Sequence, residues 1–147
     1  MQVFRIRFKD TLKAFFACFA AAGICFYFMC ARGSAFPFLK GERTYYLYSP
    51  SSQAVITKEY SLKDYFSLKG ESVFILTEEP KREMKKILKE LKATVLFEEE
   101  VDGVRSYYCR ARGLFKGIQI NGLTVNLHIA VKENSVAVGT PIIFGGY

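Results

Sequence analysis

The hydrophobic pattern begins with an unbroken apolar run over residues 14–31, which holds five phenylalanines and no charged residue. As an α-helix this run is about 27 Å long, close to the ~30 Å hydrocarbon core of a bilayer. A surface helix of a soluble domain has a polar face, and this run has none. The pattern therefore predicts that residues 14–31 form a transmembrane helix.

Basic residues on both sides of this run predict its orientation. They are Arg5, Arg7, Lys9 and Lys13 before it, and Arg32, Lys40 and Arg43 after it. The positive-inside rule places the richer side, residues 1–13, in the cytoplasm and the rest of the chain outside. The small residues 33–35 suit a signal peptidase that cleaves after Ala35, but cleaved signals have shorter apolar runs of about 7–15 residues. The length favours a retained signal-anchor, and a cleaved, secreted product is the alternative.

After the apolar run, the pattern becomes that of one small folded domain. Residues 32–43 contain Pro37 and two glycines and are predicted to be a linker, so the domain is expected over residues 44–147. Its first half alternates between apolar and polar positions, as strands do. The predicted elements are a β-hairpin at 44–48 and 54–60, a helical turn at 61–66 that Gly70 ends, and a buried strand at 72–77.

The clearest helical pattern follows Pro80, a residue that suits the first turn of a helix. Apolar residues then recur at helical spacing at Met84, Ile87, Leu88 and Leu91. The other faces carry basic residues, namely Lys81, Arg82, Lys85, Lys86, Lys89 and Lys92. A basic helix face is usually solvated, and the alternative is contact with anionic lipid headgroups.

The second half of the domain predicts four antiparallel strands. They are expected over residues 94–99, 104–112, 118–131 and 136–144. Asp102-Gly103 is a strong hairpin signal, whereas Asn121-Gly122 either turns a second hairpin or bulges one long strand. Pro141 suggests that the last strand lies at a sheet edge. A strand, a helix with one apolar stripe and four further strands predict an α+β fold in which the helix covers one face of the sheet.

Net charge and cysteine content narrow the possible functions. The chain has a formal charge of +7, but residues 1–35 hold five basic residues and one acidic residue, which leaves a mixed, mildly basic domain. Nucleic acid is therefore not an expected partner. Cys18, Cys25 and Cys30 lie in the apolar run, so Cys109 is alone in the domain and no disulfide can close there. With a single histidine and no zinc spacing, neither a metal site nor a cofactor is predicted.

Strand periodicity separates the two faces of the predicted sheet. Val125, Leu127, Ile129 and Val131 share one face with Tyr107, Cys109 and Ala111. If this face meets the helix, Cys109 is a buried structural thiol on the opposite side from His128, and the two cannot form a nucleophilic pair. The other face then exposes the candidate binding residues Tyr108, Arg110, Arg112, Asn126 and His128. Such a group could hold an anion or a sugar ring, or it could simply be the solvated side of an antiparallel sheet.

No catalytic motif is found in the chain. The serine-hydrolase, zinc-protease, P-loop and dinucleotide-binding patterns are all missing from the sequence, so an enzyme is not expected. The carboxylates at Glu98, Glu99, Glu100 and Asp102 lack calcium-loop spacing and are better explained by solubility.

The C-terminal half carries a resemblance to a known family in residues 125–130 (VNLHIA), residues 139–143 (GTPII) and Tyr147. This resemblance covers residues 72–147 and is to the YwmB family of spore-forming Gram-positive bacteria, which has a TATA-box-binding-protein-like fold. It implies an extracytoplasmic protein whose function is unknown, and it assigns no functional residue. A fold shared with a DNA-binding protein does not imply DNA binding.

These observations favour a membrane-tethered, non-enzymatic domain outside the cytoplasm that contacts a protein partner or the cell envelope. The alternative is a sensor or enzyme that binds a small ligand or an anion on the exposed sheet face. A third hypothesis, a cytoplasmic nucleic-acid binder, requires that residues 14–31 do not insert into a membrane.

Overall fold

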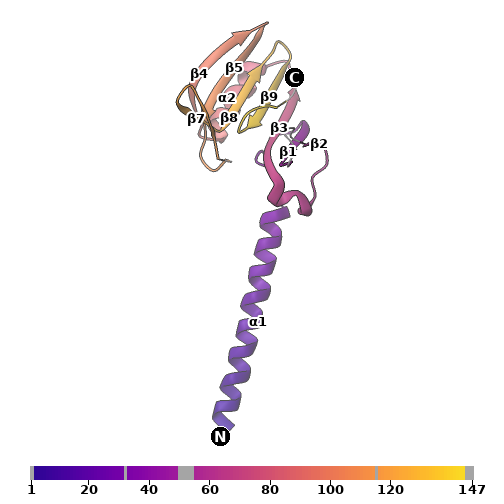
Figure 1. Ribbon diagram of the computed structural model, residues 1–147, viewed down its shortest axis with the longest axis vertical. Coiled ribbons are helices and arrows are strands. Elements are labelled where there is room, and N and C mark those ends of the chain that lie inside the picture. The colour runs from indigo at the N-terminus through magenta and orange to yellow at the C-terminus, as the bar shows by residue number, and fades with distance from the viewer. Residues whose placement is uncertain (1, 32, 50–54, 115, 145–147) are drawn as a thin grey trace. The chain divides into compact units, whose positions relative to one another are not determined.

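The computed structural model describes residues 2–31, 33–49, 55–114 and 116–144 (Figure 1). The chain forms two compact units, Met1–Gly33 and Ser34–Tyr147. The first unit is a helix and the second is a domain of strands with one α-helix, so the predicted α+β class is confirmed.

Helix α1 (Gln2–Ala31) extends further toward the N-terminus than the predicted apolar run. The helix continues through the basic residues because helix propagation is favourable once nucleated and neither proline nor glycine interrupts this part. Within it, Asp10–Phe28 is long and apolar enough to cross a membrane, and none of this span is buried against the described part of the chain. The predicted membrane-compatible helix is therefore present, judged by its length and composition.

A seven-stranded sheet with the order β2-β1-β3-β9-β8-β5-β4 forms the body of the domain. Its strands are β1 (Glu42–Leu47), β2 (Val55–Thr57), β3 (Leu68–Leu76), β4 (Thr94–Val101), β5 (Val104–Arg110), β8 (Leu127–Val131) and β9 (Ser135–Thr140). All neighbouring strands are antiparallel. The predicted hairpin of β1 and β2 is thus the outer part of one continuous sheet.

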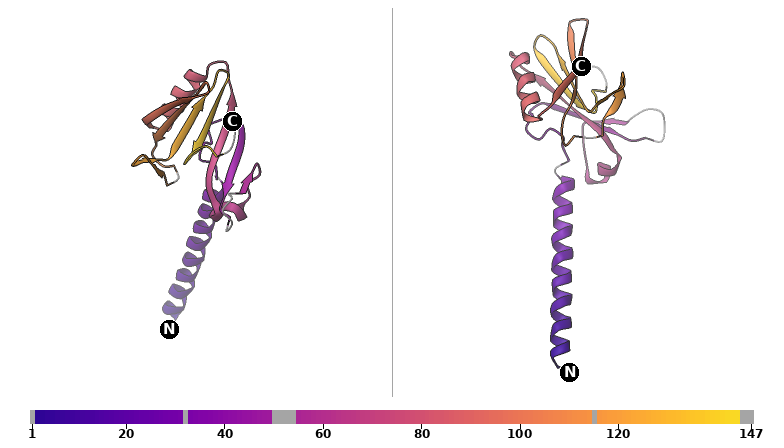
Figure 2. Two further views of the ribbon diagram at one scale, coloured as in Figure 1. Left: turned by 45° about the horizontal axis from the view of Figure 1, so that its top comes forward. Right: turned by 90° about the vertical axis from the view of Figure 1, so that its left-hand side faces the viewer.

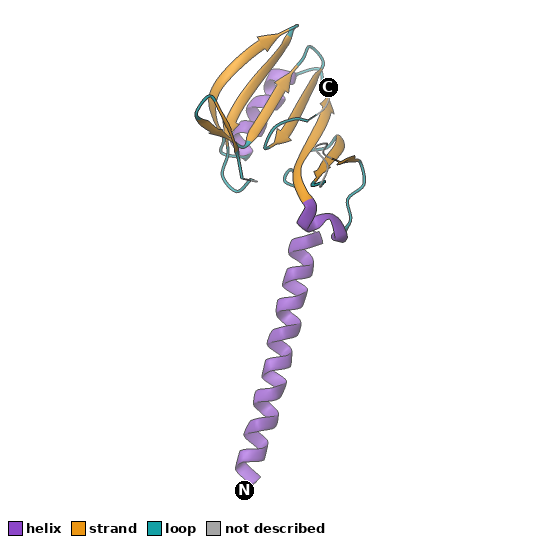
Figure 3. Ribbon diagram, viewed as in Figure 1, coloured by secondary structure: helices purple, strands orange, loops and turns teal. Residues whose placement is uncertain are grey.

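Helix α2 (Pro80–Glu90) lies on one face of this sheet, against β8 and β9 (Figures 2 and 3). Met84 and Ile87 are buried, and Leu88 and Leu91 are partly buried against the same core. The predicted apolar stripe is confirmed, because it is the stripe that removes the helix from water. The basic side chains on the remaining faces are exposed or pair locally, as Arg82 does with Glu79 at 2.8 Å.

Residues 34–41, predicted as part of a linker, belong to the domain. Phe36 is fully buried and Leu39 is 3% exposed, and both join the core on the α2 side of the sheet. Gly41 is exposed but approaches β3 closely, since an added Cβ would lie 2.2 Å from the backbone oxygen of Phe74. The linker prediction failed because proline and glycine are typical of loops, and the burial of two apolar side chains in this loop is a tertiary effect.

Three predictions about strand ends are corrected. Strand β9 is central, between β3 and β8, and Pro141 follows its last residue rather than marking an edge. Gly70 lies inside β3 instead of ending the preceding 3-10 helix η1 (Leu62–Ser67). Glycine is needed there because a Cβ would lie 2.4 Å from the carbonyl oxygen of Thr140. The strand expected up to Val131 is interrupted at Asn126, whose side chain binds backbone groups of Ala111.

The two dipeptide turn signals both form hairpins. Asp102 and Gly103 have φ of 50° and 75° between β4 and β5, as the sequence predicted. Asn121 and Gly122 have φ of 51° and 76° and join β6 (Ile118–Ile120) to β7 (Leu123–Val125), a separate two-stranded sheet. Positive φ at both central residues is the requirement of a type I′ turn, so the hairpin alternative holds for Asn121-Gly122.

Candidate binding groove

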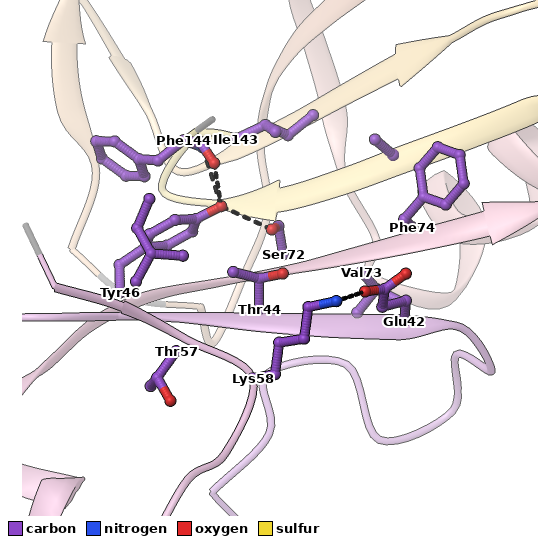
Figure 4. A pocket seen from close by; sticks show the side chains of 12 residues that line it. Glu42, Thr44, Tyr46, Thr57, Lys58, Ser72, Val73, Phe74, Ile143 and Phe144 are labelled. Atoms are coloured by element: carbon purple, nitrogen blue, oxygen red, sulfur yellow. Dashed lines mark hydrogen bonds and ion pairs between the residues drawn. The ribbon is translucent and has the colours of Figure 1, made fainter. Parts of the chain in front are cut away.

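A groove with a cavity volume of about 500 Å³ lies on the sheet face opposite α2 (Figure 4). Strands β1, β2 and β3 form most of its lining, and residues 143 and 144 form one wall. Its apolar part includes Ile56, Phe74 and Ala137, and its polar part includes Thr44 and Ser72. The volume is within the range of small-ligand sites, about 300–1,000 Å³.

Tyr46 ties the groove wall to the sheet. Its hydroxyl is hydrogen-bonded to Ser72 Oγ at 2.7 Å, accepts the backbone N–H of Phe144 at 3.2 Å and donates to the Phe144 carbonyl oxygen. The Tyr46 and Phe144 rings also pack with their centroids 4.7 Å apart. Since Tyr46 is 1% exposed, its hydroxyl serves the fold and is not presented to a ligand.

An ion pair between Glu42 of β1 and Lys58, just beyond β2, borders the groove (Figure 4). The two side chains are 57% and 74% exposed, respectively. An exposed pair of this kind contributes at most about 1 kcal/mol to stability. It does leave one cation and one anion beside an apolar surface, which is an arrangement suited to binding a partner's polar groups.

The sequence-predicted residues do not form one exposed site. Tyr108 stacks on His128, with ring centroids 4.6 Å apart and an interplanar angle of 8°. Arg110 and Arg112 are exposed, but Asn126 and His128 are only 9% and 5% exposed. The predicted open face was therefore wrong at Asn126 and His128, because β8 and β9 are covered on both sides.

Each of the two buried polar residues has a structural partner. The amide of Asn126 accepts the N–H of Ala111 at 2.7 Å and donates to the Ala111 carbonyl oxygen at 2.8 Å. His128 Nδ1 accepts the backbone N–H of Ile143 at 3.3 Å. Burial lowers the pKa of His128 to about 4, because water no longer stabilises the imidazolium form. His128 is thus a neutral acceptor at physiological pH.

The stacked rings extend across three strands on the face opposite α2. Phe97 of β4 stacks on Tyr108 of β5 with centroids 4.5 Å apart, and Tyr108 stacks on His128 of β8. Cross-strand aromatic pairs of this kind are a normal source of sheet stability. Tyr108 and His128 are therefore explained by packing without a ligand.

Cys109 lies on the α2 side of the sheet and is fully buried in the core. Its strand partner is Leu127, whereas the partner of Tyr108 is His128. The predicted separation of Cys109 from His128 is therefore confirmed. Burial raises the pKa of the Cys109 thiol to about 12, so it remains protonated and inert.

The carboxylate run lies in the edge strand β4 with its side chains exposed. Glu100 pairs with Arg105 at 2.6 Å across the hairpin. Among the described residues, no group of three or more His, Cys, Asp or Glu side chains is placed to hold a metal ion. Charged residues on an edge strand discourage pairing with another chain, which agrees with the predicted role in solubility.

A buried charge cluster that the sequence reasoning missed connects the start of the domain to β3. The carboxylate of Glu71, which is fully buried, accepts Ser34 Oγ at 2.7 Å, the Ala35 N–H at 2.6 Å and Arg43 Nη1 at 3.0 Å. Arg43 also donates through Nη2 to the carbonyl oxygens of Phe36 and Leu39, at 3.0 and 2.7 Å. We call Ser34, Ala35, Arg43 and Glu71 the entry clamp. The strand predicted from the sequence began at residue 72, so Glu71 fell outside it and gave no local signal of burial.

No protein-family model, no curated protein and no solved structure matches this chain. Its function is therefore argued from its own residues.

Proposed function

We propose that this chain is a single-pass membrane protein whose domain lies outside the cytoplasm and binds a protein partner or the cell envelope without catalysis. The observation that carries the proposal is the apolar surface of α1. The span Asp10–Phe28 is not buried against the described part of the chain. Transfer of each exposed phenylalanine side chain from water into an apolar environment is favourable by about 1.5–3 kcal/mol. A helix of 19 residues reaches ~28 Å and fits a bilayer core.

The proposed orientation follows from charge. Arg5, Arg7, Lys9 and Lys13 precede the predicted apolar run of residues 14–31 and outnumber the three basic residues that follow it closely. Positive residues remain preferentially on the cytoplasmic side. The N-terminus is therefore cytoplasmic in this proposal, and the domain is outside.

The entry clamp supports a retained anchor over a cleaved signal. Cleavage after Ala35 would remove Ser34 and Ala35, which together supply two of the three donors to the buried Glu71 carboxylate described above. A buried carboxylate that loses its hydrogen-bond donors is costly. The domain is thus built to fold with residues 34 and 35 attached.

Binding rather than catalysis is supported by the state of the most reactive side chains. Cys109 is buried with a raised pKa, and burial lowers the pKa of His128 and keeps it neutral. Arg110 and Arg112 are exposed, whereas Cys109 and His128 are buried. The available surface chemistry is that of contact, through the groove and the exposed apolar side chains.

Cysteine labelling in intact cells tests the proposal. In a chain carrying Glu99→Cys, a membrane-impermeant maleimide should label the exposed edge strand β4 from outside, whereas Gln2→Cys should react only after permeabilisation. Cys18, Cys25 and Cys30 are replaced by alanine in both variants, and the same chain without the added cysteine is the control, because its remaining thiol, Cys109, is buried. Labelling with the opposite sidedness would refute the orientation. Recovery of the unprocessed chain in the soluble fraction without detergent would refute the anchor.

The second candidate function is binding of a small molecule or an anion, and the groove favours it through its volume of about 500 Å³. A ligand of this site should raise the melting temperature of the parent chain. Thr44→Phe fills the groove and should abolish the shift, whereas Thr94→Phe on the exposed edge strand should preserve it. Equal shifts in both variants would exclude the groove as the site.

A further inference from the structure

The entry clamp fixes the point at which the membrane helix joins the domain. Ser34 and Ala35 are held by Glu71, which pairs with Tyr45 of β1 near the beginning of β3. Only two residues separate Ser34 from the last residue of α1. An extended chain covers at most ~3.6 Å per residue, so a membrane-spanning α1 keeps this part of the domain close to the bilayer surface.

Three large apolar side chains are exposed at the same end of the domain. Their exposed fractions are 62% for Tyr48, 49% for Val55 and 81% for Phe66. We call these three residues the aromatic end. Leu68 lies three strand residues before Glu71, so the aromatic end begins about 10 Å from the clamp.

The members of the aromatic end are neighbours in the structure. Leu47, which precedes Tyr48, pairs with both Val55 and Leu68. The backbone N–H of Tyr48 donates to the carbonyl oxygen of Ser67 at 2.6 Å, which places Tyr48 beside the end of η1. Strands β1, β2 and the beginning of β3 gather at this end (Figure 1). Exposed apolar side chains that cluster in this way mark an interaction surface.

Two lysines belong to the elements that form the aromatic end. Lys63 of η1 and Lys69 of β3 are exposed, and Lys69 Nζ lies 5.3 Å from the centre of the Tyr48 ring. Aromatic side chains with an adjacent polar or cationic group are the residues that settle at the boundary between headgroups and acyl chains. The chemistry of this end therefore matches a lipid surface.

We propose that the aromatic end docks into the headgroup boundary of the bilayer that α1 spans, with Phe66 and Tyr48 as the inserting side chains. This inference rests on the proposed membrane anchor. The tether makes the contact intramolecular, so a patch with weak affinity for lipid is still occupied. Docking in this manner sets the domain's orientation on the membrane and leaves the groove and the edge strand β4 for a partner.

Tryptophan fluorescence can test this docking, because the chain contains no tryptophan. The full chain is reconstituted in phosphatidylcholine vesicles with brominated acyl chains, which quench tryptophan on contact. Phe66→Trp is the test variant. Leu76→Trp is the matched control, because Leu76 is 78% exposed and lies at the far end of β3, about 26 Å away at strand spacing. Phe19→Trp, within the apolar span, reports insertion of the anchor.

Docking predicts that bromolipid quenches Phe66→Trp at least about twofold more than Leu76→Trp, since interfacial residues reach ~5–10 Å into the boundary. Quenching of Phe19→Trp without quenching of Phe66→Trp would retain the anchor and overturn the docking. Equal quenching of Phe66→Trp and Leu76→Trp would also overturn it. An unquenched Phe19→Trp would overturn the anchor and the docking together. A Phe66→Trp blue shift that depends on protein concentration and not on lipid would assign the aromatic end to a second copy of the chain instead.

Discussion

The most informative perturbation is the removal of the Glu71 carboxylate from the entry clamp. Glu71→Ala eliminates the acceptor for Ser34 Oγ, the Ala35 N–H and Arg43 Nη1, which lie 2.7, 2.6 and 3.0 Å from it. A hydrogen bond to a charged group is worth about 1.5–3 kcal/mol, but the restored cost of burying the carboxylate offsets part of that sum. Breaking a buried pair by removing one partner costs about 3–5 kcal/mol. We expect Glu71→Ala to lower the free energy of unfolding by that amount.

Cys109 supplies the assay. Its thiol is fully buried in the core, and burial raises its pKa to about 12, so it reacts with a maleimide only when the domain unfolds. In a chain with Cys18, Cys25 and Cys30 replaced by alanine, labelling across a denaturant series in detergent reports the fraction unfolded at each concentration. The midpoint and slope of that curve give the free energy of unfolding.

Two matched variants make the result specific. Glu98→Ala removes an exposed carboxylate from the edge strand β4 and should change the unfolding free energy by less than about 0.5 kcal/mol. Glu71→Gln keeps one carbonyl acceptor and should lie between Glu71→Ala and the parent. If Glu71→Ala is as stable as Glu98→Ala, the clamp does not hold the segment, and the argument for a retained anchor loses its structural support.

Three further predictions concern the sheet face opposite α2. His128 has a lowered pKa of about 4 in the folded domain and an ordinary pKa of ~6.5 in the unfolded chain. Because the unfolded chain therefore binds the proton first as the pH falls, the free energy of unfolding should decrease by about 3 kcal/mol between pH ~6.5 and pH ~4. Denaturant unfolding at pH 6.5 and at pH 4 should show this decrease in the parent but not in His128→Gln. An equal decrease in the two proteins would contradict the prediction. Tyr46→Phe removes the hydroxyl that holds Phe144 and should cost about 1–2 kcal/mol in the same unfolding assay, so an unchanged midpoint would contradict it. Gly139→Ala places a Cβ 2.7 Å from the Ile143 nitrogen and should cost about 1–3 kcal/mol through overpacking, so a variant as stable as the parent would refute it.

The parts of the fold that sequence pattern predicted are those with local causes. The α2 stripe of Met84, Ile87 and Leu88 follows from helical spacing, and the two hairpin turns follow from dipeptides that tolerate positive φ. The position of Cys109 on the α2 side of the sheet follows from strand alternation alone. These features needed no knowledge of distant residues.

The features that sequence pattern missed depend on contacts between residues far apart in the chain. Strand alternation predicts that His128 is exposed, because it assumes that one face of the sheet is solvated. In the structure Ile143, which lies 15 positions away in the chain, covers His128. The clamp joins Ala35 to Glu71, 36 positions apart, and no local signal in the linker anticipates it. The candidate site therefore lies in the groove over β1, β2 and β3, on the same face of the sheet as Tyr108 and His128 but on other strands.

The same long-range contacts connect stability to membrane attachment. Phe36 and Leu39 complete the core on the α2 side of the sheet, and the residues directly before them satisfy the buried Glu71. The segment that follows α1 is thus a structural part of the domain, and a protein cut after Ala35 would lose two of the three donors to a buried charge. A secreted form would be less stable by up to the cost of the clamp, about 3–5 kcal/mol, which is a large share of the ~5–15 kcal/mol typical of a domain. We therefore expect cleavage after Ala35 to destabilise the domain, which supports the proposal that the N-terminal helix is retained.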